Sequence, residues 1–192
     1  MAFTNVPGRS GKHAVEILEG FEGIQQVDGC AGYNRVLDLR DNAPIQLAYC
    51  WVHARRKLYE LTHNNVAPIV EEGLKQIAGL YRIEGQVRGQ SAEERLAERQ
   101  QKPASKVATF KIWLNHALTQ VSAKAPTGQA LKYMEKYLDG LILFLADGCI
   151  EMDSNAVERT IRPIALQRKN ALFAGHDAGA QNWAMLASLI ET

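Results

Sequence analysis

The chain has 192 residues, of which 46% are hydrophobic, enough for one large domain or for one domain with an insertion. Its formal net charge of +1 does not indicate nucleic-acid binding, so such a role would have to come from local clusters of charge. Three scattered cysteines argue against a disulfide framework and favour a reducing cytoplasm, and no stretch has the length of a membrane span.

The first part of the chain predicts strands that alternate with helices. A short helix is expected at 14–18, followed by a strand that ends at Asp28. A second short helix is expected at 31–39, and the apolar stretch Pro44–Cys50 predicts a second strand. The spacing of apolar residues from Trp51 onward is that of a helix. This order of elements predicts a βαβ unit with parallel strands.

The middle of the chain lacks strand signals and predicts helices throughout. Its apolar residues recur at every third or fourth position. Ser91 and Glu94 have the spacing of a capping box at a helix start. Two further helices are expected at 104–121 and 127–146.

The last part of the chain contains "EMDSNAVERTIRP", which allows two interpretations. If Asn155 is an N-cap, Glu158 stands at position N3 of a capping box and can pair with Arg162 one turn later. Alternatively, Glu158 binds a metal ion, while Arg159 and Arg162 neutralise a phosphate nearby. The final helix carries no stop signal, which is typical of a chain cut within an element.

Asp28 and the Cys50–His53 pair also allow two interpretations each. Asp-Gly after a strand is most often a turn, but ligand sites in parallel sheets gather at the carboxyl ends of strands. If Asp28 and Glu158 met in space, two-metal phosphoryl transfer would be possible. Cys50 and His53 have zinc-ligand spacing, but no second pair follows. A buried cysteine and a hydrogen-bonded histidine at a strand–helix junction are the simpler interpretation.

Basic residues form two short clusters. The run Arg55, Arg56 and Lys57 is either a solvated helix face or, beside a catalytic crevice, a contact for the DNA backbone. Arg168 and Lys169 add a second pair near the Glu158 region. "PGRSGKH" has too few glycines, in the wrong spacing, for a phosphate-binding P-loop.

Four segments together resemble the transposases of the insertion sequence 66 family. They are "VDGCAGYNRV", "CWVHARRKLYE", "EMDSNAVERTIRPIALQRKNALFAGHDAG" and "SLIET", which cover nearly the whole chain in order. The stretch that contains Asn155 and Glu158 is the most specific of them.

The resemblance implies an α/β, mostly helical fold: a partial ribonuclease-H-like core with a large all-helical insertion. Residues 1–63 would form part of the core, 64–148 the insertion and 149–192 the return to the core. The family's catalytic centre holds three acids of the Asp-Asp-Glu type, and its second Asp and its Glu match Asp28 and Glu158. Such enzymes use Mg²⁺ or Mn²⁺ to cleave and transfer DNA strands at the ends of the element.

The sequence departs from the family pattern before Asp28, where no Asp occurs, and at Cys30, where the family usually has Tyr. The family's zinc-binding and DNA-recognition regions are also missing. We therefore expect a transposase fragment that is inactive alone. The expected partners are transposon and target DNA, other transposase copies and accessory proteins of the element. We expect the protein in the cytoplasm and expect no membrane partner. The alternatives are a non-catalytic DNA-binding remnant or regulator of transposition, and an inert helical protein in which Glu158 only caps a helix.

Overall fold

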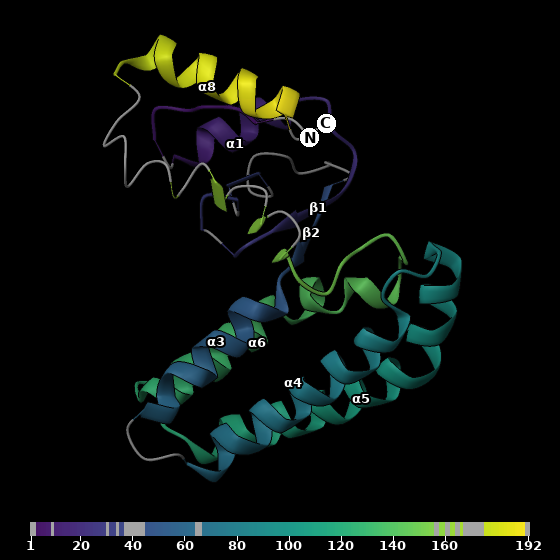
Figure 1. Ribbon diagram of the computed structural model, residues 1–192. Helices are drawn as coiled ribbons and strands as arrows, with labels where there is room; N and C mark the ends of the chain where they lie inside the picture. The colour runs from purple at the N-terminus through teal and green to yellow at the C-terminus, as the bar shows by residue number, and fades with distance from the viewer. Residues whose placement is uncertain are drawn as a thin grey trace. The chain divides into compact units, whose positions relative to one another are not determined.

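The computed structural model describes residues 3–8, 10–29, 31–33, 35–36, 45–63, 67–155, 158–159, 162–163, 166 and 175–190. Most of these residues are helical, and two short strands form a sheet (Figure 1). The elements are α1 (Gly11–Ile17), β1 (Gly23–Val27), η1 (Ala31–Tyr33), β2 (Ile45–Tyr49), α3 (Trp51–Tyr59), η2 (Glu60–His63), α4 (Pro68–Val87), α5 (Ala92–Gln120), α6 (Pro126–Leu141), η3 (Leu143–Leu145) and α8 (Asp177–Ile190).

The two strands pair in parallel, as the order of predicted elements indicates. Gly23 lies opposite Ile45, and Val27 lies opposite Tyr49. Both strands fall where the sequence predicts them, and β1 ends one residue before Asp28. Every residue of β2 except Gln46 is buried, so this strand contributes to the core along almost its whole length.

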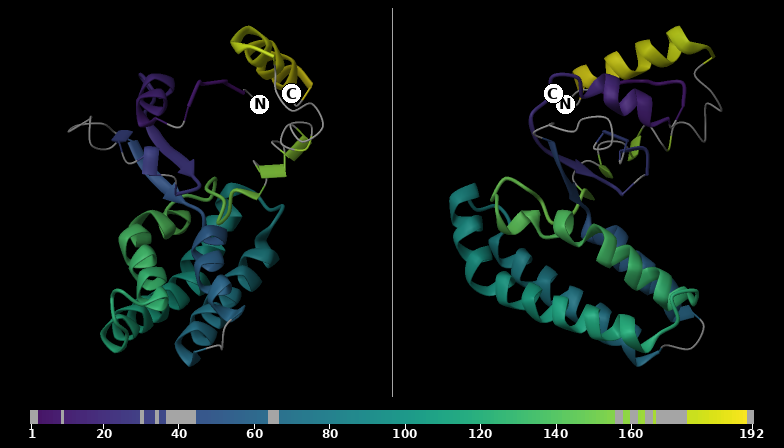
Figure 2. Two further views of the ribbon diagram at one scale, coloured as in Figure 1. Left: turned by 90° about the vertical axis from the view of Figure 1, so that its left-hand side faces the viewer. Right: turned by 180° about the vertical axis from the view of Figure 1, so that it is seen from behind.

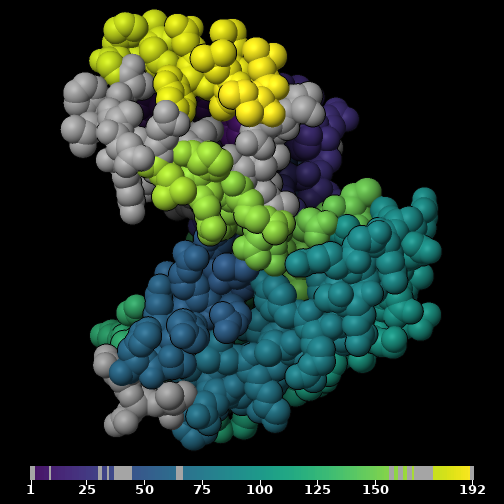
Figure 3. All heavy atoms as spheres, in the orientation of Figure 1, coloured from purple at the N-terminus to yellow at the C-terminus, as the bar shows by residue number. Residues whose placement is uncertain are grey.

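Helices α3, α4, α5 and α6 pack in a ring in which each helix contacts the next and α6 returns to α3 (Figures 1 and 2). The rings of Trp51 and Phe110 meet edge to face inside it, with centroids 5.3 Å apart. The indole nitrogen of Trp51 donates a hydrogen bond to the Leu141 carbonyl at 2.7 Å. On the face that Figure 3 shows, side chains of α3 and α4 fill the space between the two helices. Further fully buried members of this core are Leu58, Ile77, Leu80, Leu114, Leu131 and Met134.

Helix α5 is longer than the sequence predicts. The capping box of Ser91 and Glu94 is confirmed, with backbone-to-side-chain bonds of 3.0 and 3.3 Å in the two directions. The helix expected to begin at residue 104, however, is continuous with this start and runs through the buried Pro103. Proline costs about 3 kcal/mol inside a helix, so tertiary packing offsets the local penalty. Helix α6 ends at Leu141, five residues before the predicted end.

Helix α6 lies directly against β2, and Gly140 makes this approach possible. A Cβ atom at Gly140 would overlap the backbone carbonyl of Leu47 and the ring of Tyr49. The absence of a side chain at this one position therefore sets how closely the helical block packs on the sheet.

The chain divides into two compact units. Unit 1 comprises Met1–Glu22, Cys30–Ala43 and Ser154–Thr192, and unit 2 comprises Gly23–Gly29 and Pro44–Asp153. Both strands and the four-helix ring thus belong to unit 2. In unit 1 the Phe3 amide donates a hydrogen bond to the Ser188 hydroxyl of α8 at 2.8 Å. The division at residues 63 and 148 that the sequence suggests stays a prediction about the family core, and the compact units follow other boundaries.

Candidate metal and nucleic-acid site

Asp28 stands immediately after the carboxyl end of β1, and its side chain is exposed. Gly29 follows with a φ of +85°, a left-handed conformation that favours glycine. The positive φ ends the extended backbone of β1, and Asp28 with Gly29 is here called the Asp28 turn. The same turn also presents a carboxylate at the edge of a parallel sheet where ligands usually bind.

A group of three tyrosines from β2 and α6 lies next to this turn. The hydroxyl of Tyr133 contacts Gly29 closely enough that a Cβ there would collide with it. Tyr137 contacts both other rings, edge to face with Tyr133 at 4.8 Å between centroids and tilted against Tyr49 at 4.3 Å. Burial raises the pKa of Tyr133 to about 12, and neighbours that include Tyr137 and Asp28 add to the rise. Tyr133 thus stays a protonated hydroxyl beside the Asp28 turn.

The three basic residues of α3 are all exposed, but they face different neighbours. The guanidinium of Arg55 lies 5.3 Å from the centre of the Tyr59 ring, at the end of the same helix. The ammonium of Lys57 instead lies 5.6 Å from the centre of the Tyr133 ring on α6. Lys57 is therefore the member of the run that contacts the tyrosine beside the Asp28 turn. Arg56 is exposed between them.

The side of α3 that faces α4 carries a second polar group around Tyr81. Burial raises the pKa of Tyr81 strongly, and the carboxylate of Asp153 raises it further, whereas Arg55 and Arg88 oppose the rise. Arg55 therefore acts on the Tyr81 side of the helix. Cys50 is buried at the N-cap of α3, as expected, and His53 lies in the first turn of α3 and is half-buried.

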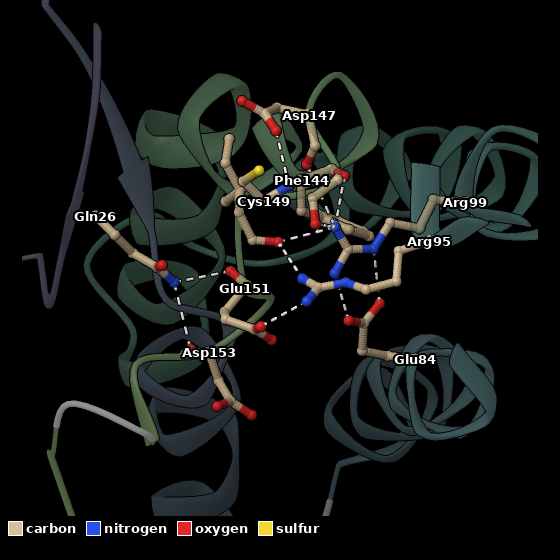
Figure 4. A network of polar contacts seen from close by, with 11 residues as sticks. Gln26, Glu84, Arg95, Arg99, Phe144, Asp147, Cys149, Glu151 and Asp153 are labelled. Carbon is tan, nitrogen blue, oxygen red and sulfur yellow. Dashed lines mark hydrogen bonds and ion pairs between the residues drawn. The ribbon is translucent and has the colours of Figure 1, made fainter. Parts of the chain in front are cut away.

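Residues 144–153, here called the exit segment, carry the chain out of the helical ring (Figure 4). Arg99 is fully buried and forms an ion pair with the buried Glu84. The same guanidinium donates to the carbonyl oxygens of Phe144, Asp147, Gly148 and Ile150 at 2.8–3.5 Å. One buried cation thus fixes most of this turn.

The later part of the exit segment is fixed by two further residues, Arg95 and Gln26. Arg95 forms an ion pair of 2.8 Å with Glu151 and donates to the Ile150 carbonyl at 3.1 Å. The amide of Gln26 on β1 donates to the carbonyls of Glu151 and Asp153 at 2.7 and 3.3 Å (Figure 4). The exit segment therefore runs beside β1 just before the Asp28 turn.

Glu158 belongs to unit 1 and has an exposed side chain. Asn155 already has a helical backbone, so the helix starts at the predicted N-cap position, one residue earlier than expected. The Ser154 hydroxyl donates to the Glu158 carboxylate at 3.1 Å, and the Glu158 amide donates to the Ser154 carbonyl at 2.9 Å. A hydroxyl at the helix start therefore holds the carboxylate of Glu158.

The remaining predicted site residues are partly described. Arg159 and Arg162 are exposed and, like Glu158, have a helical backbone, whereas Arg168 and Lys169 lie outside the described residues. Asp28 and Glu158 belong to different units, whose positions relative to one another are not determined. Their meeting in one site stays a prediction.

The described residues lack both a cluster of metal ligands and a membrane-spanning helix. No group of three or more His, Cys, Asp or Glu side chains that could hold a metal ion occurs within the described ranges. Among the helices that the structure describes, none is long and apolar enough to cross a membrane. That Asp28 and Glu158 bind a metal together therefore stays a prediction.

Sequence reasoning missed the roles of Tyr133 and Arg99. Both lie in the block that reads only as amphipathic helices, and no local pattern marks either residue. Lys57 is visible in the basic run, but nothing in the sequence distinguishes it from Arg55 and Arg56. Helical geometry could have shown that the three face different ways, since successive residues point about 100° apart.

Comparison with known proteins finds relatives that match nearly the whole chain. The chain is 40% identical to the uncharacterized protein y4qI of Sinorhizobium fredii (strain NBRC 101917 / NGR234), covering 100% of this chain and 36% of that protein. It is 38% identical to the uncharacterized protein y4jD of the same strain, over 96% of this chain and 37% of that protein. The chain thus spans little more than a third of the length of these relatives. No solved structure matches it significantly.

A family model described as "Transposase IS66 family" matches residues 1–182, a range that includes both Asp28 and Glu158. The family that the motifs suggest is therefore confirmed, and the chain belongs to the IS66 family of transposases.

Proposed function

We propose that the chain supplies two of the three acids of a metal-dependent transposase centre, within a ribonuclease-H-like core. Asp28 and Glu158 would hold Mg²⁺ or Mn²⁺ and act in DNA strand cleavage and strand transfer at the ends of the insertion sequence. Because the 192-residue chain brings two of these acids, we expect it to be inactive by itself.

The observation that carries the proposal is the position of Asp28. Its exposed carboxylate directly follows the carboxyl end of β1 in a parallel pair, the edge at which ligands bind in sheets of this type. Carboxylate oxygens are the ligands that Mg²⁺ prefers. A centre of two such ions stabilises the attacking and leaving oxygens of a displaced phosphodiester.

The path of the exit segment supports a shared site. Gln26 holds the backbone of Asp153 against β1, two residues before Asp28. Glu158 follows Asp153 by five residues, a length of chain that spans no more than about 18 Å. Chain length therefore permits Glu158 to join Asp28 in one site, as we propose.

The exposed arginines of the Glu158 helix fit the same chemistry. Arg159 and Arg162 would contact the phosphates of the strand that is cut, since a guanidinium binds phosphate oxygens with paired hydrogen bonds. Four further basic residues would bind the DNA backbone farther along the strand, as contacts that do not depend on sequence. They are Arg55, Arg56, Arg168 and Lys169.

The test is Fe²⁺-directed cleavage of the polypeptide, in which Fe²⁺ replaces Mg²⁺ and generates radicals that cut the backbone next to the metal. We expect cuts near both Asp28 and Glu158, and we expect Asp28→Asn to abolish both sets. Glu93→Gln, at an exposed acid in the first turn of α5, is the matched control. Cuts near only one of the two acids would contradict the shared site.

A second candidate function is DNA binding without catalysis, which the exposed arginines of α3 favour. It predicts binding that is independent of sequence and weakens steeply as salt rises. Dependence on a metal ion distinguishes the two functions. DNA binding without catalysis predicts the same affinity for DNA with and without EDTA, and no Fe²⁺-directed cuts at the two acids.

A further inference from the structure

The contact between α3 and α6 brings a cation and a hydroxyl to the turn that carries Asp28. Lys57 is exposed, with its ammonium 5.6 Å from the centre of the Tyr133 ring. The hydroxyl of Tyr133 in turn lies against Gly29, the residue after Asp28. Helices α3 and α6 contact each other, and in the right-hand view of Figure 2 α6 lies in front of α3. All these residues belong to unit 2, so their arrangement does not depend on how the units are placed.

The chemistry of the pair suits an anion. Within the part of the chain that the structure describes, Lys57 forms no ion pair with a carboxylate. Its ammonium lies over the ring face of Tyr133 instead, which leaves its hydrogen-bond donors available. The Tyr133 hydroxyl stays protonated at neutral pH and can donate to an oxygen. A phosphate that met both groups would gain one charge contact and one neutral hydrogen bond.

We propose that Lys57 and Tyr133 form a binding site for a DNA phosphate beside the Asp28 turn, next to the phosphate at which the strand is cut. The proposal rests on the proposed function, since it takes DNA as the substrate. Under this proposal the helical ring itself contacts the bound DNA strand. It also distinguishes the members of the basic run, because Lys57 faces the Tyr133 side and Arg55 faces Tyr59 and Tyr81.

The two residues should leave different signatures in DNA binding. Loss of Lys57 removes one phosphate contact, so the slope of log affinity against log salt should become shallower by about 0.9. Loss of the Tyr133 hydroxyl removes a neutral donor, so affinity should fall without a change in that slope. A merely structural role for either residue would not produce this difference.

The experiment is fluorescence anisotropy of the whole 192-residue chain with a labelled DNA duplex of arbitrary sequence, in EDTA and over a series of salt concentrations. We expect Lys57→Ala to weaken binding by about 5-fold at low salt and to reduce the slope. Lys57→Arg should restore the slope, and Tyr133→Phe should weaken binding by about 3-fold with the slope kept. The matched controls are Lys75→Ala on α4 and Tyr59→Phe on α3, both at exposed side chains.

Two possible outcomes distinguish a failure of the proposed function from a failure of the phosphate site. If the unmodified chain bound no DNA at low salt, the proposed function and the phosphate site would both be wrong. If it bound DNA but Lys57→Ala matched Lys75→Ala, only the phosphate site would be wrong. Circular dichroism of each variant tests whether the fold is kept, and we expect it to be kept because Lys57 is exposed and phenylalanine keeps the ring of Tyr133.

Discussion

The helical ring and helix α8 differ in what covers their apolar side chains. In the ring, residues such as Leu58, Phe110 and Leu114 are completely buried, because each helix has a neighbour on both sides. In α8 no residue is buried, and Leu189 and Ile190 are 70% and 80% exposed. Both regions have helical apolar spacing, so the difference shows that amphipathic spacing predicts a helix but not its partner.

The largest expected effect concerns the buried ion pair of the ring. Arg99→Ala leaves Glu84 charged in an apolar environment and removes the donors to the exit segment, so we expect a loss of about 3–5 kcal/mol in the free energy of unfolding. Urea unfolding followed by far-UV circular dichroism measures this loss. Lys102→Ala, at an exposed ion pair of the same helix, is the control and should cost less than about 1 kcal/mol. Equal effects of the two changes would contradict the role of Arg99.

The next prediction compares a buried leucine of the ring with an exposed leucine of α8. Leu114→Ala removes a fully buried side chain from the ring and should cost about 2–5 kcal/mol. Leu189→Ala makes the same chemical change at an exposed position of α8 and should stay within about 0.5 kcal/mol. The same urea titration reports both values. A loss above about 2 kcal/mol at Leu189 would mean that a partner covers α8 in solution.

A smaller effect is expected at the Asp28 turn. Gly29→Ala places a side chain at a φ of +85° and against the Tyr133 hydroxyl, so we expect a loss of about 1–2 kcal/mol. In a Tyr133→Phe background the collision disappears and only the backbone cost of about 1 kcal/mol remains. A double-mutant cycle measures the difference. Strict additivity would show that Tyr133 does not contact Gly29 in solution.

The last prediction concerns a loss of stability in alkali. Burial raises the pKa of Tyr49 and of Tyr133 to about 12, against an ordinary value of about 10. Below pH 10 both folded and unfolded states keep these protons, so the two groups cause no pH dependence there. Between pH 10 and 12 the unfolded state releases them first, and stability falls as the pH rises. The urea concentration at the midpoint of unfolding should therefore decline over this pH range. It should decline less steeply in Tyr133→Phe. A phenolate absorbance titration centred near pH 10 for every tyrosine would contradict this.

Much of the local structure could be predicted from the residues alone. The strands before Asp28 and before Cys50, their parallel pairing and the helix after Cys50 all occur as predicted. The helix start at Ser91 is also confirmed. These features depend on alternation, helical spacing and capping, which act over a few residues. The motifs around Asp28 and Glu158 likewise suffice to recognise the family, because they are long and specific.

Other features were decided only by the tertiary structure. Helix α5 continues through Pro103 because packing outweighs the local penalty. Arg99, a residue type that is normally exposed, is buried because Glu84 and a turn of carbonyl groups surround it. Tyr133 reaches the Asp28 turn across more than a hundred residues of sequence, through the close approach of α6 to β2 at Gly140. Local patterns determine which segments become helices and strands, whereas the neighbours of each side chain depend on contacts between segments far apart in the chain.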